Sequence, residues 1–144
     1  MKVYMCKVCY HLEFGEAPEF CPVCHAPKTS FVQNDNIFIE SKQKSPEAEV
    51  KHVPALTVDK SCGLVPEGCT DVHIRIGKTL HPMEEKHFIQ FADCYLDNIY
   101  IERVHFSARG VNPVTSLHLK KDSGKITVVE NCSIHGFWMA EVNL

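Results

Sequence analysis

Two stretches of alternating hydrophobic and polar residues decide the fold: DVHIRI at residues 71–76 and IYIERV at residues 99–104. This alternation places every second side chain on the same face, which is the pattern of a half-buried β-strand. Further predicted strands, separated by Gly, Pro, Asn and Asp residues, are 87–91, 114–119, 126–129 and 137–142. We therefore predict a mainly β fold, an antiparallel β-sandwich over about 110 residues.

The N-terminal segment has a different composition, rich in Cys and Pro and poor in aliphatic residues. A unit below about 40 residues rarely folds on a hydrophobic core alone, so this segment requires a metal or a partner. Residues 33–36 are polar, and the charged run at 40–47 is expected to be a solvated loop. The prediction is a small domain at 1–35 and a β-sandwich domain at 36–144, with no long amphipathic helix.

Composition and charge exclude several functional classes. The chain has 144 residues, and its 15 basic and 18 acidic side chains give a net charge of −3 without a basic block, so we expect no binding to nucleic acid. No hydrophobic run approaches the roughly 18 residues of a membrane span, and the start MKVYMCKVCY does not resemble a signal peptide. We expect a cytoplasmic protein without membrane contact. In a reducing compartment its 8 cysteines and 9 histidines favour metal binding over disulfides.

Two C-x2-C pairs stand in the N-terminal segment. A gap of two residues lets both thiolates of a pair face one ion, and two such pairs complete a tetrahedral site for zinc or iron. The predicted ligands are Cys6, Cys9, Cys21 and Cys24.

Three later segments carry His and Cys residues at metal-ligand spacing: KHVP at 51–54, HPMEEKH at 81–87 and CSIHGFW at 132–138. Each alone is a weak signal, because single histidines are more often packed or surface residues. The other cysteines, Cys62, Cys69 and Cys94, have no partner at ligand spacing. The isolated histidines of the strand patterns, which we expect to be packed or surface groups, are His73, His105 and His118.

The N-terminal segment resembles the rubredoxin-like domain of rubrerythrins over the stretch YMCKVCYHLEFGEAPEFCPVCHAPKTSFV, residues 4–32. The resemblance implies a single iron held by the four cysteines and acting as a one-electron carrier. Rubredoxins place glycine after each second cysteine, where a positive φ is favourable. Here those positions are Tyr10 and His25, which leaves a structural zinc ribbon as an alternative.

The rest of the chain resembles superoxide reductases, the desulfoferrodoxin and neelaredoxin family. The matching segments are KHVP, then GKTLHPMEEKHFIQF at 77–91, then C-x-x-HG-x-W at 132–138. The resemblance implies an immunoglobulin-like β-sandwich and a mononuclear non-haem iron that reduces superoxide to hydrogen peroxide. Its implied ligands are four equatorial imidazoles and one axial thiolate: His52, His81, His87, His135 and Cys132.

The same resemblance implies partners and a role for one lysine. Lys51 matches a family lysine that attracts the anionic substrate, whereas the glutamate that usually precedes it is replaced here by Val50. An extended segment would also point Glu49 away from the side of Val50. Electrons would come through the four-cysteine site from an external donor such as rubredoxin or a reductase, and a homodimer or homotetramer is expected. The alternative function is an electron-transfer or iron-binding protein without turnover of its own.

Overall fold

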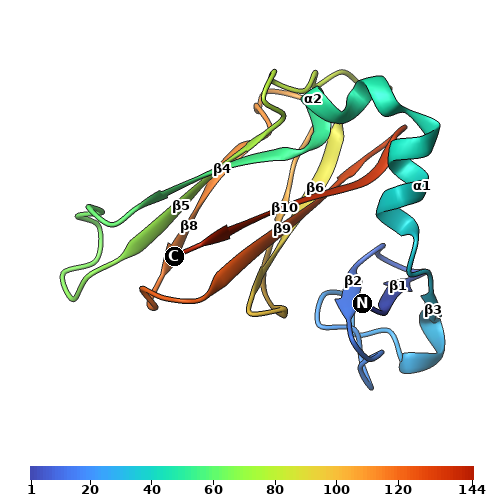
Figure 1. Ribbon diagram of the computed structural model, residues 1–144, viewed down its shortest axis with the longest axis horizontal. Helices are drawn as coiled ribbons and strands as arrows, with labels where there is room; N and C mark the ends of the chain where they lie inside the picture. The colour runs from blue at the N-terminus through green and yellow to red at the C-terminus, as the bar shows by residue number, and fades with distance from the viewer.

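The computed structural model describes residues 1–144, which form a small N-terminal sheet and a larger antiparallel sandwich (Figure 1). The small sheet has the order β2-β1-β3, with β1 at Val3–Cys6, β2 at Leu12–Phe14 and β3 at Phe31–Gln33. A single 3-10 turn, η1 at Lys28–Ser30, precedes β3. Both pairings of the central strand are antiparallel, and β1 ends on the first cysteine of the first C-x2-C pair.

The sandwich consists of two antiparallel sheets, as the period-two pattern predicts. One sheet has the order β4-β5-β8, with the strands Pro54–Asp59, Thr70–Ile76 and Val114–Leu119. The other has the order β10-β9-β6-β7, with the strands Gly136–Asn143, Lys125–Cys132, Ile89–Leu96 and Ile99–His105. Alternate residues such as Val72, Ile74 and Ile76 on β5 are buried in the core between the sheets. Strand β4 was missed from the sequence, and β6 begins two residues later than predicted.

A helix occupies the charged run that we expected to be a solvated loop, so that expectation was wrong. Helix α1 spans Ile37–Lys44 and is followed by the turn η2 at Pro46–Ala48 and the short helix α2 at Glu49–His52. The buried residues of α1 are Ile37 and Ser41, one turn apart on the same face. The Ser41 hydroxyl accepts a hydrogen bond from the Phe137 backbone N–H at 3.0 Å, which joins the helix to β10. Tertiary contacts therefore stabilise this helix, which could not be predicted from its polar composition.

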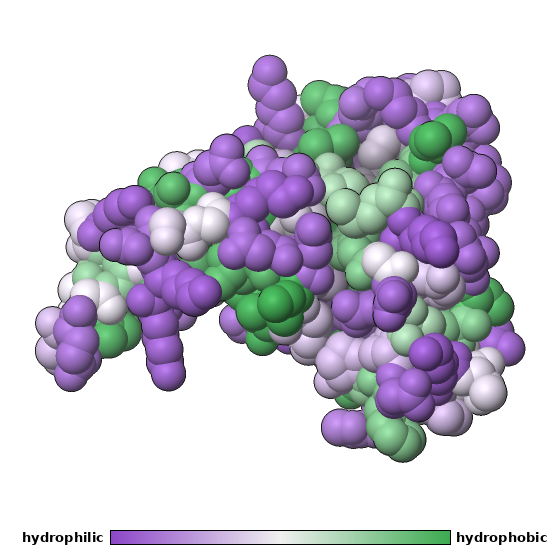
Figure 2. Space-filling model, turned by 60° about the horizontal axis from the view of Figure 1, so that its bottom comes forward, coloured by the Kyte–Doolittle hydropathy of each residue, from purple (hydrophilic) through white to green (hydrophobic).

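The small sheet packs directly on the sandwich below α1 (Figure 1). A second buried cluster contains Val3 and Leu12 from the small sheet together with Phe91 and Tyr95 from β6. The Tyr95 hydroxyl donates a hydrogen bond to the Leu12 carbonyl at 2.6 Å. Hydrophilic residues predominate on the face that Figure 2 shows, and hydrophobic ones are scattered among them. None of the helices has the length and hydrophobicity needed to cross a membrane.

Candidate metal centres

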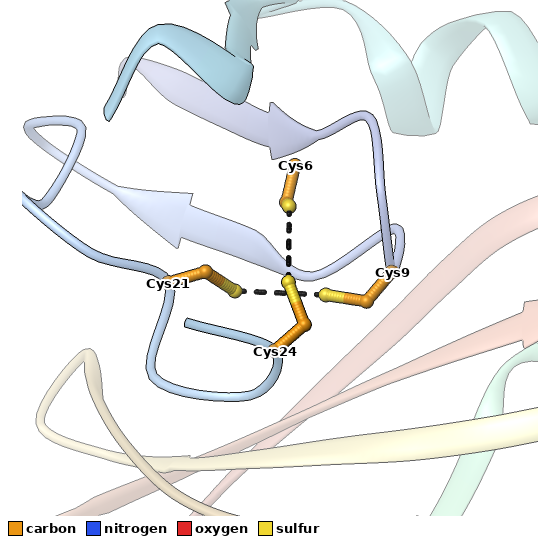
Figure 3. Close-up of side chains that lie close together, drawn as sticks. All are labelled: Cys6, Cys9, Cys21 and Cys24. Atoms are coloured by element: carbon orange, nitrogen blue, oxygen red, sulfur yellow. Dashed lines mark hydrogen bonds between the residues drawn. The ribbon is translucent and has the colours of Figure 1, made fainter. Parts of the chain in front are cut away.

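The four N-terminal cysteines converge on one point, and we call them the four-cysteine site (Figure 3). The Sγ atoms of Cys6 and Cys24 are 3.7 Å apart, and those of Cys9 and Cys21 are 3.5 Å apart. A tetrahedral ion with metal–sulfur bonds of about 2.3 Å requires sulfur–sulfur separations of about 3.8 Å. The arrangement therefore fits a tetrahedral ion bound by four thiolates, and zinc and iron both take this donor set.

The two turns that carry these cysteines have the same backbone geometry. The N–H of Tyr10 donates to the Cys6 carbonyl at 2.9 Å, and the N–H of His25 donates to the Cys21 carbonyl at 2.9 Å. The φ angles of Tyr10 and His25 are 63° and 61°. The left-handed conformation that favours glycine is therefore adopted here by non-glycine residues, at a local cost of about 1–2 kcal/mol each.

The second group of predicted ligands also converges, at the end of the sandwich next to α2, and we call it the histidine–cysteine site. His52 is the last residue of α2, Cys132 is the last residue of β9, and the loop between β5 and β6 supplies two histidines. Four of the predicted ligands have donor atoms that all lie within 4.8 Å of one another: His52, His81, His87 and Cys132.

The fifth predicted ligand, His135, borders this group in the short loop between β9 and β10. Its Nδ1 atom lies 3.7 Å from Sγ of Cys132. Its ring centroid lies 4.9 Å from those of both His52 and His87. His135 thus lies next to the other four predicted ligands, although its donor atoms fall outside the 4.8 Å group.

Carbonyl groups fix the tautomers of two of the imidazoles. Nδ1 of His52 donates to the Ala48 carbonyl at 2.8 Å, and Nδ1 of His81 donates to the Pro82 carbonyl at 2.6 Å. Each ring therefore turns an Nε2 lone pair into the site, and the two Nε2 atoms are 3.1 Å apart. Burial, opposed by the hydrogen bond to Ala48, lowers the pKa of His52 to about 4, and burial with the neighbouring imidazoles lowers that of His81 to about 4. Neutral rings with facing lone pairs fit a bound cation.

The remaining donors are consistent with the same ion. His87 Nε2 is buried and has no hydrogen-bond partner in the protein. Burial raises the pKa of Cys132, and the backbone N–H of Ile134, 3.5 Å from Sγ, opposes this effect. A soft thiolate among imidazoles is a donor set for iron, zinc or copper, which places the site among those of transition metals.

Contacts around the ligands hold the loop between β9 and β10 in place. Trp138 donates from Nε1 to the His135 carbonyl at 3.1 Å, and its ring centroid lies 5.2 Å from that of His52. Gly136 has a φ of 77°, and a Cβ atom there would lie 2.6 Å from Oγ of Ser41. Trp138 is buried, so it shields this side of the site from water.

Around Lys51 the structure corrects one expectation. Residues 49–52 form helix α2, so the extended geometry from which we placed Glu49 was wrong. The Glu49 carboxylate accepts a hydrogen bond from Nζ of Lys42 at 3.1 Å on the surface. Val50 and Lys51 are exposed, and the charge of Lys51 contributes to lowering the pKa of His87, after burial and His135.

A third group of metal-binding residue types was missed by the sequence analysis, which had treated His118 as isolated. Its members are Cys62, Cys69, Asp71 and His118, whose donor atoms all lie within 4.8 Å of one another. Asp71 pairs with His118 in the register of β5 and β8. Ligand spacing along the chain could not reveal this pairing, because 47 residues separate the two side chains. The only available signal was that Cys62 and Cys69 flank a Gly- and Pro-containing turn.

Comparison with known proteins gives matches to both parts of the chain. Residues 43–141 match the family described as desulfoferrodoxin, and residues 4–32 match the rubredoxin-like domain of rubrerythrin. A desulfoferrodoxin of Syntrophotalea carbinolica is 31% identical over 98% of this chain and 96% of its own length. A superoxide reductase of Pyrococcus furiosus is 30% identical over 65% of this chain and 88% of its own length. The solved structure of a superoxide reductase from Nanoarchaeum equitans, 28% identical, aligns with a TM-score of 0.55 over 65% of this chain and 93% of that chain.

Proposed function

The chain belongs to the desulfoferrodoxin family, and from this premise we propose that it is a superoxide reductase, which converts superoxide to hydrogen peroxide with one electron and two protons. The observation that carries the proposal is the convergence of imidazoles and a thiolate from three separate segments on one point. A donor set of this kind suits a redox-active iron. The proposed ligands are His52, His81, His87, His135 and Cys132.

Iron bound at the histidine–cysteine site would supply the electron, and its five protein ligands would leave one position open for the substrate. The protein's own groups prepare that site. The carbonyls of Ala48 and Pro82 hold two imidazoles in the tautomer that presents Nε2. The Ile134 N–H stabilises negative charge on the Cys132 sulfur, and Trp138 limits the access of water.

Lys51 is proposed to attract the superoxide anion and to help deliver protons to the product. Replacing Lys51 by alanine should lower the second-order rate constant with superoxide by about 10-fold at low ionic strength and flatten its dependence on salt. Stopped-flow kinetics at several salt concentrations measures this. The exposed Lys121, on the turn before β9, is the matched control, and Lys121→Ala should keep the wild-type salt dependence. Equal rate constants and equal salt dependence for wild type and Lys51→Ala would show that Lys51 does not attract the substrate.

The four-cysteine site is proposed to hold iron and to pass electrons to the histidine–cysteine site, with zinc as the alternative metal. Its cysteines come from a segment that matches a rubredoxin-like domain, and this match supports the iron assignment. We further propose an external electron donor such as rubredoxin or a reductase, a homodimer or homotetramer, and a cytoplasmic location. None of the 8 cysteines forms a disulfide, which agrees with a reducing compartment. The division of the chain near residue 35 stays a prediction.

The function is tested by the visible spectrum and the superoxide reaction of the iron-loaded protein. The oxidised protein should show rubredoxin-type sulfur-to-iron bands and a broad red band from Cys132, and the reduced protein should consume superoxide in a second-order reaction. Cys132→Ser should lose the red band, and its rate should fall by more than the roughly 10–100-fold typical of losing a supporting contact.

Cys94→Ala is the matched control for that experiment, because Cys94 is a buried thiol of β6 outside the site. It should keep the band and the rate. A colourless protein that binds only zinc would exclude both superoxide reduction and electron transfer. An iron protein with both spectra that reacts no faster than Cys132→Ser would instead be an electron carrier.

A further inference from the structure

The third cluster lies where the connection between β4 and β5 meets β8. Cys62 belongs to that connection, Cys69 immediately precedes β5, Asp71 lies on β5 and His118 on β8. In Figure 1 this connection is at the far left, whereas α2 is at the upper right, so the cluster lies at the opposite end of the sheet from the histidine–cysteine site. We propose that the cluster is a third metal site, built for zinc or a zinc-like ion.

The distances within the cluster are close to those of a tetrahedral site. Nδ1 of His118 lies 3.8 Å from Sγ of Cys62 and 3.7 Å from Sγ of Cys69. The bond lengths that zinc makes with sulfur, nitrogen and oxygen imply separations of about 3.3–3.6 Å between such donors. Oδ1 of Asp71 lies 2.9 Å from His118 Nδ1 and 3.1 Å from Cys69 Sγ. Both distances are those of hydrogen bonds. They would increase by a few tenths of an ångström if a metal ion replaced the protons that Asp71 now accepts.

The cluster is not a set of exposed side chains that meet by chance, because two of its four members are buried. Cys69 and Asp71 are 8% and 7% exposed, and strand pairing fixes Asp71 directly opposite His118. Cys62 is half-buried and His118 remains partly open, so the ion has a way in from solvent. Cys69 also borders a surface hollow that is lined by Lys60 and Glu67. The site is thus both pre-formed and accessible.

The donor chemistry selects the ion. Two thiolates, one imidazole and one carboxylate are all accepted ligands of zinc, whereas magnesium and calcium prefer oxygen donors alone. Binding would release the two thiol protons to solvent, and His118 would bind through Nδ1 in the tautomer that carries its proton on Nε2. With four protein ligands no position stays open, so the site is structural and fastens the β4–β5 connection to β5 and β8.

The experiment counts zinc in the reduced full-length protein after saturation and removal of loosely bound metal. The wild type should hold one zinc per chain more than His118→Ala and than the double variant Cys62→Ser/Cys69→Ser. His73→Ala is the matched control, because His73 is an exposed histidine of the same sheet, hydrogen-bonded to Ser116, and lies outside the cluster. It should keep the wild-type content. Unaltered visible bands of the iron-loaded four-cysteine site would show that each variant is folded.

Differential alkylation tests the proposed zinc site in the wild-type protein, without any substitution. Zinc should protect Cys62 and Cys69 from alkylation in the wild type, and a chelator should restore their reactivity, while Cys94 stays unreactive in both states because it is fully buried. Equal zinc contents in wild type and His118→Ala, together with no protection, would overturn the proposal. So would a Cys62–Cys69 disulfide, detected as a mass lower by two hydrogen atoms and as missing thiols under the same reducing conditions. Neither result depends on superoxide reduction.

Discussion

Replacing Asp93 by alanine should destabilise the protein by about 3–5 kcal/mol, because it leaves the buried Arg103 guanidinium without its counter-ion. Asp93 is 0% exposed and forms a two-pronged ion pair with Arg103, at 2.5 Å from Nε and 2.7 Å from Nη2. Its Oδ2 atom also accepts a hydrogen bond from Nδ1 of His11 at 2.8 Å. One buried carboxylate therefore holds both a guanidinium and an imidazole in place.

The same substitution should loosen the four-cysteine site. Arg103 donates from Nη1 to the carbonyl of Cys9 at 2.9 Å, and its guanidinium stacks 3.6 Å above the Phe91 ring. Without Asp93 the guanidinium is no longer held between the sandwich and the first cysteine turn. Denaturant unfolding gives the free energy, and limited proteolysis of the native protein detects early cleavage within residues 1–33.

Two further variants show whether the loss of stability in Asp93→Ala comes from the unpaired buried charge. Asp122→Ala removes an exposed carboxylate and should change the free energy of unfolding by no more than about 0.5 kcal/mol. Asp93→Ala/Arg103→Met should recover part of the stability, because the unpaired buried charge is removed with its partner. A double variant that is less stable than Asp93→Ala would show that packing, and not the unpaired charge, dominates the cost.

Gly77→Ala should be the second severe change, with a loss of at least about 2–3 kcal/mol and a weaker histidine–cysteine site. Gly77 has a φ of 88°, and an added Cβ would clash with the Thr79 carbonyl and lie 2.5 Å from the Lys51 carbonyl oxygen. Both contacts are with backbone atoms, which cannot rotate away. The end of α2 must move, and it carries Lys51 and the proposed ligand His52. Unfolding curves and the iron content of the purified variant measure the two effects.

Substitutions at two other glycines distinguish the cost of the steric clash from the cost of the strained φ angle. Gly110 has a φ of 83° with open space around its missing Cβ, so Gly110→Ala should cost only about 1 kcal/mol and keep full iron content. Gly63 has neither feature, and Gly63→Ala should be close to neutral. If Gly77→Ala behaved like Gly110→Ala, the close approach to Lys51 would not be limiting.

Two ligand groups could be predicted from the sequence, one from short-range motifs and the other from a family resemblance. A C-x2-C turn fixes the relative position of its two sulfurs, and the order of the His and Cys segments identifies a family. The β-sandwich followed from the alternation at 71–76, because Val72, Ile74 and Ile76 are buried against the other sheet. The alternation at 99–104 correctly predicted strand β7, but its residues Ile99 and Ile101 are exposed and not buried as that pattern indicates. The predicted domain boundary near residue 35 falls between β3 and α1.

Features that depend on long-range packing could not be predicted. Helix α1 is stabilised through Ser41, whose hydroxyl contacts β10, and no local propensity reveals that bond. His11 has no spacing signal, although it is fully buried between Asp93 and Glu13. The pairing of Asp71 with His118 depends on the strand register, which a single sequence does not define.

The shared core of Val3, Leu12, Phe91 and Tyr95 bears on how electrons travel. A donor domain on a flexible tether approaches its acceptor by diffusion, and the length of the tether sets how often they meet. Here the small sheet is packed onto the sandwich, so packing fixes the separation of the two metal centres within a chain. The proposed internal electron transfer would then proceed as tunnelling over a constant gap, insensitive to solvent viscosity. Any rate that rises with protein concentration would belong to transfer between chains.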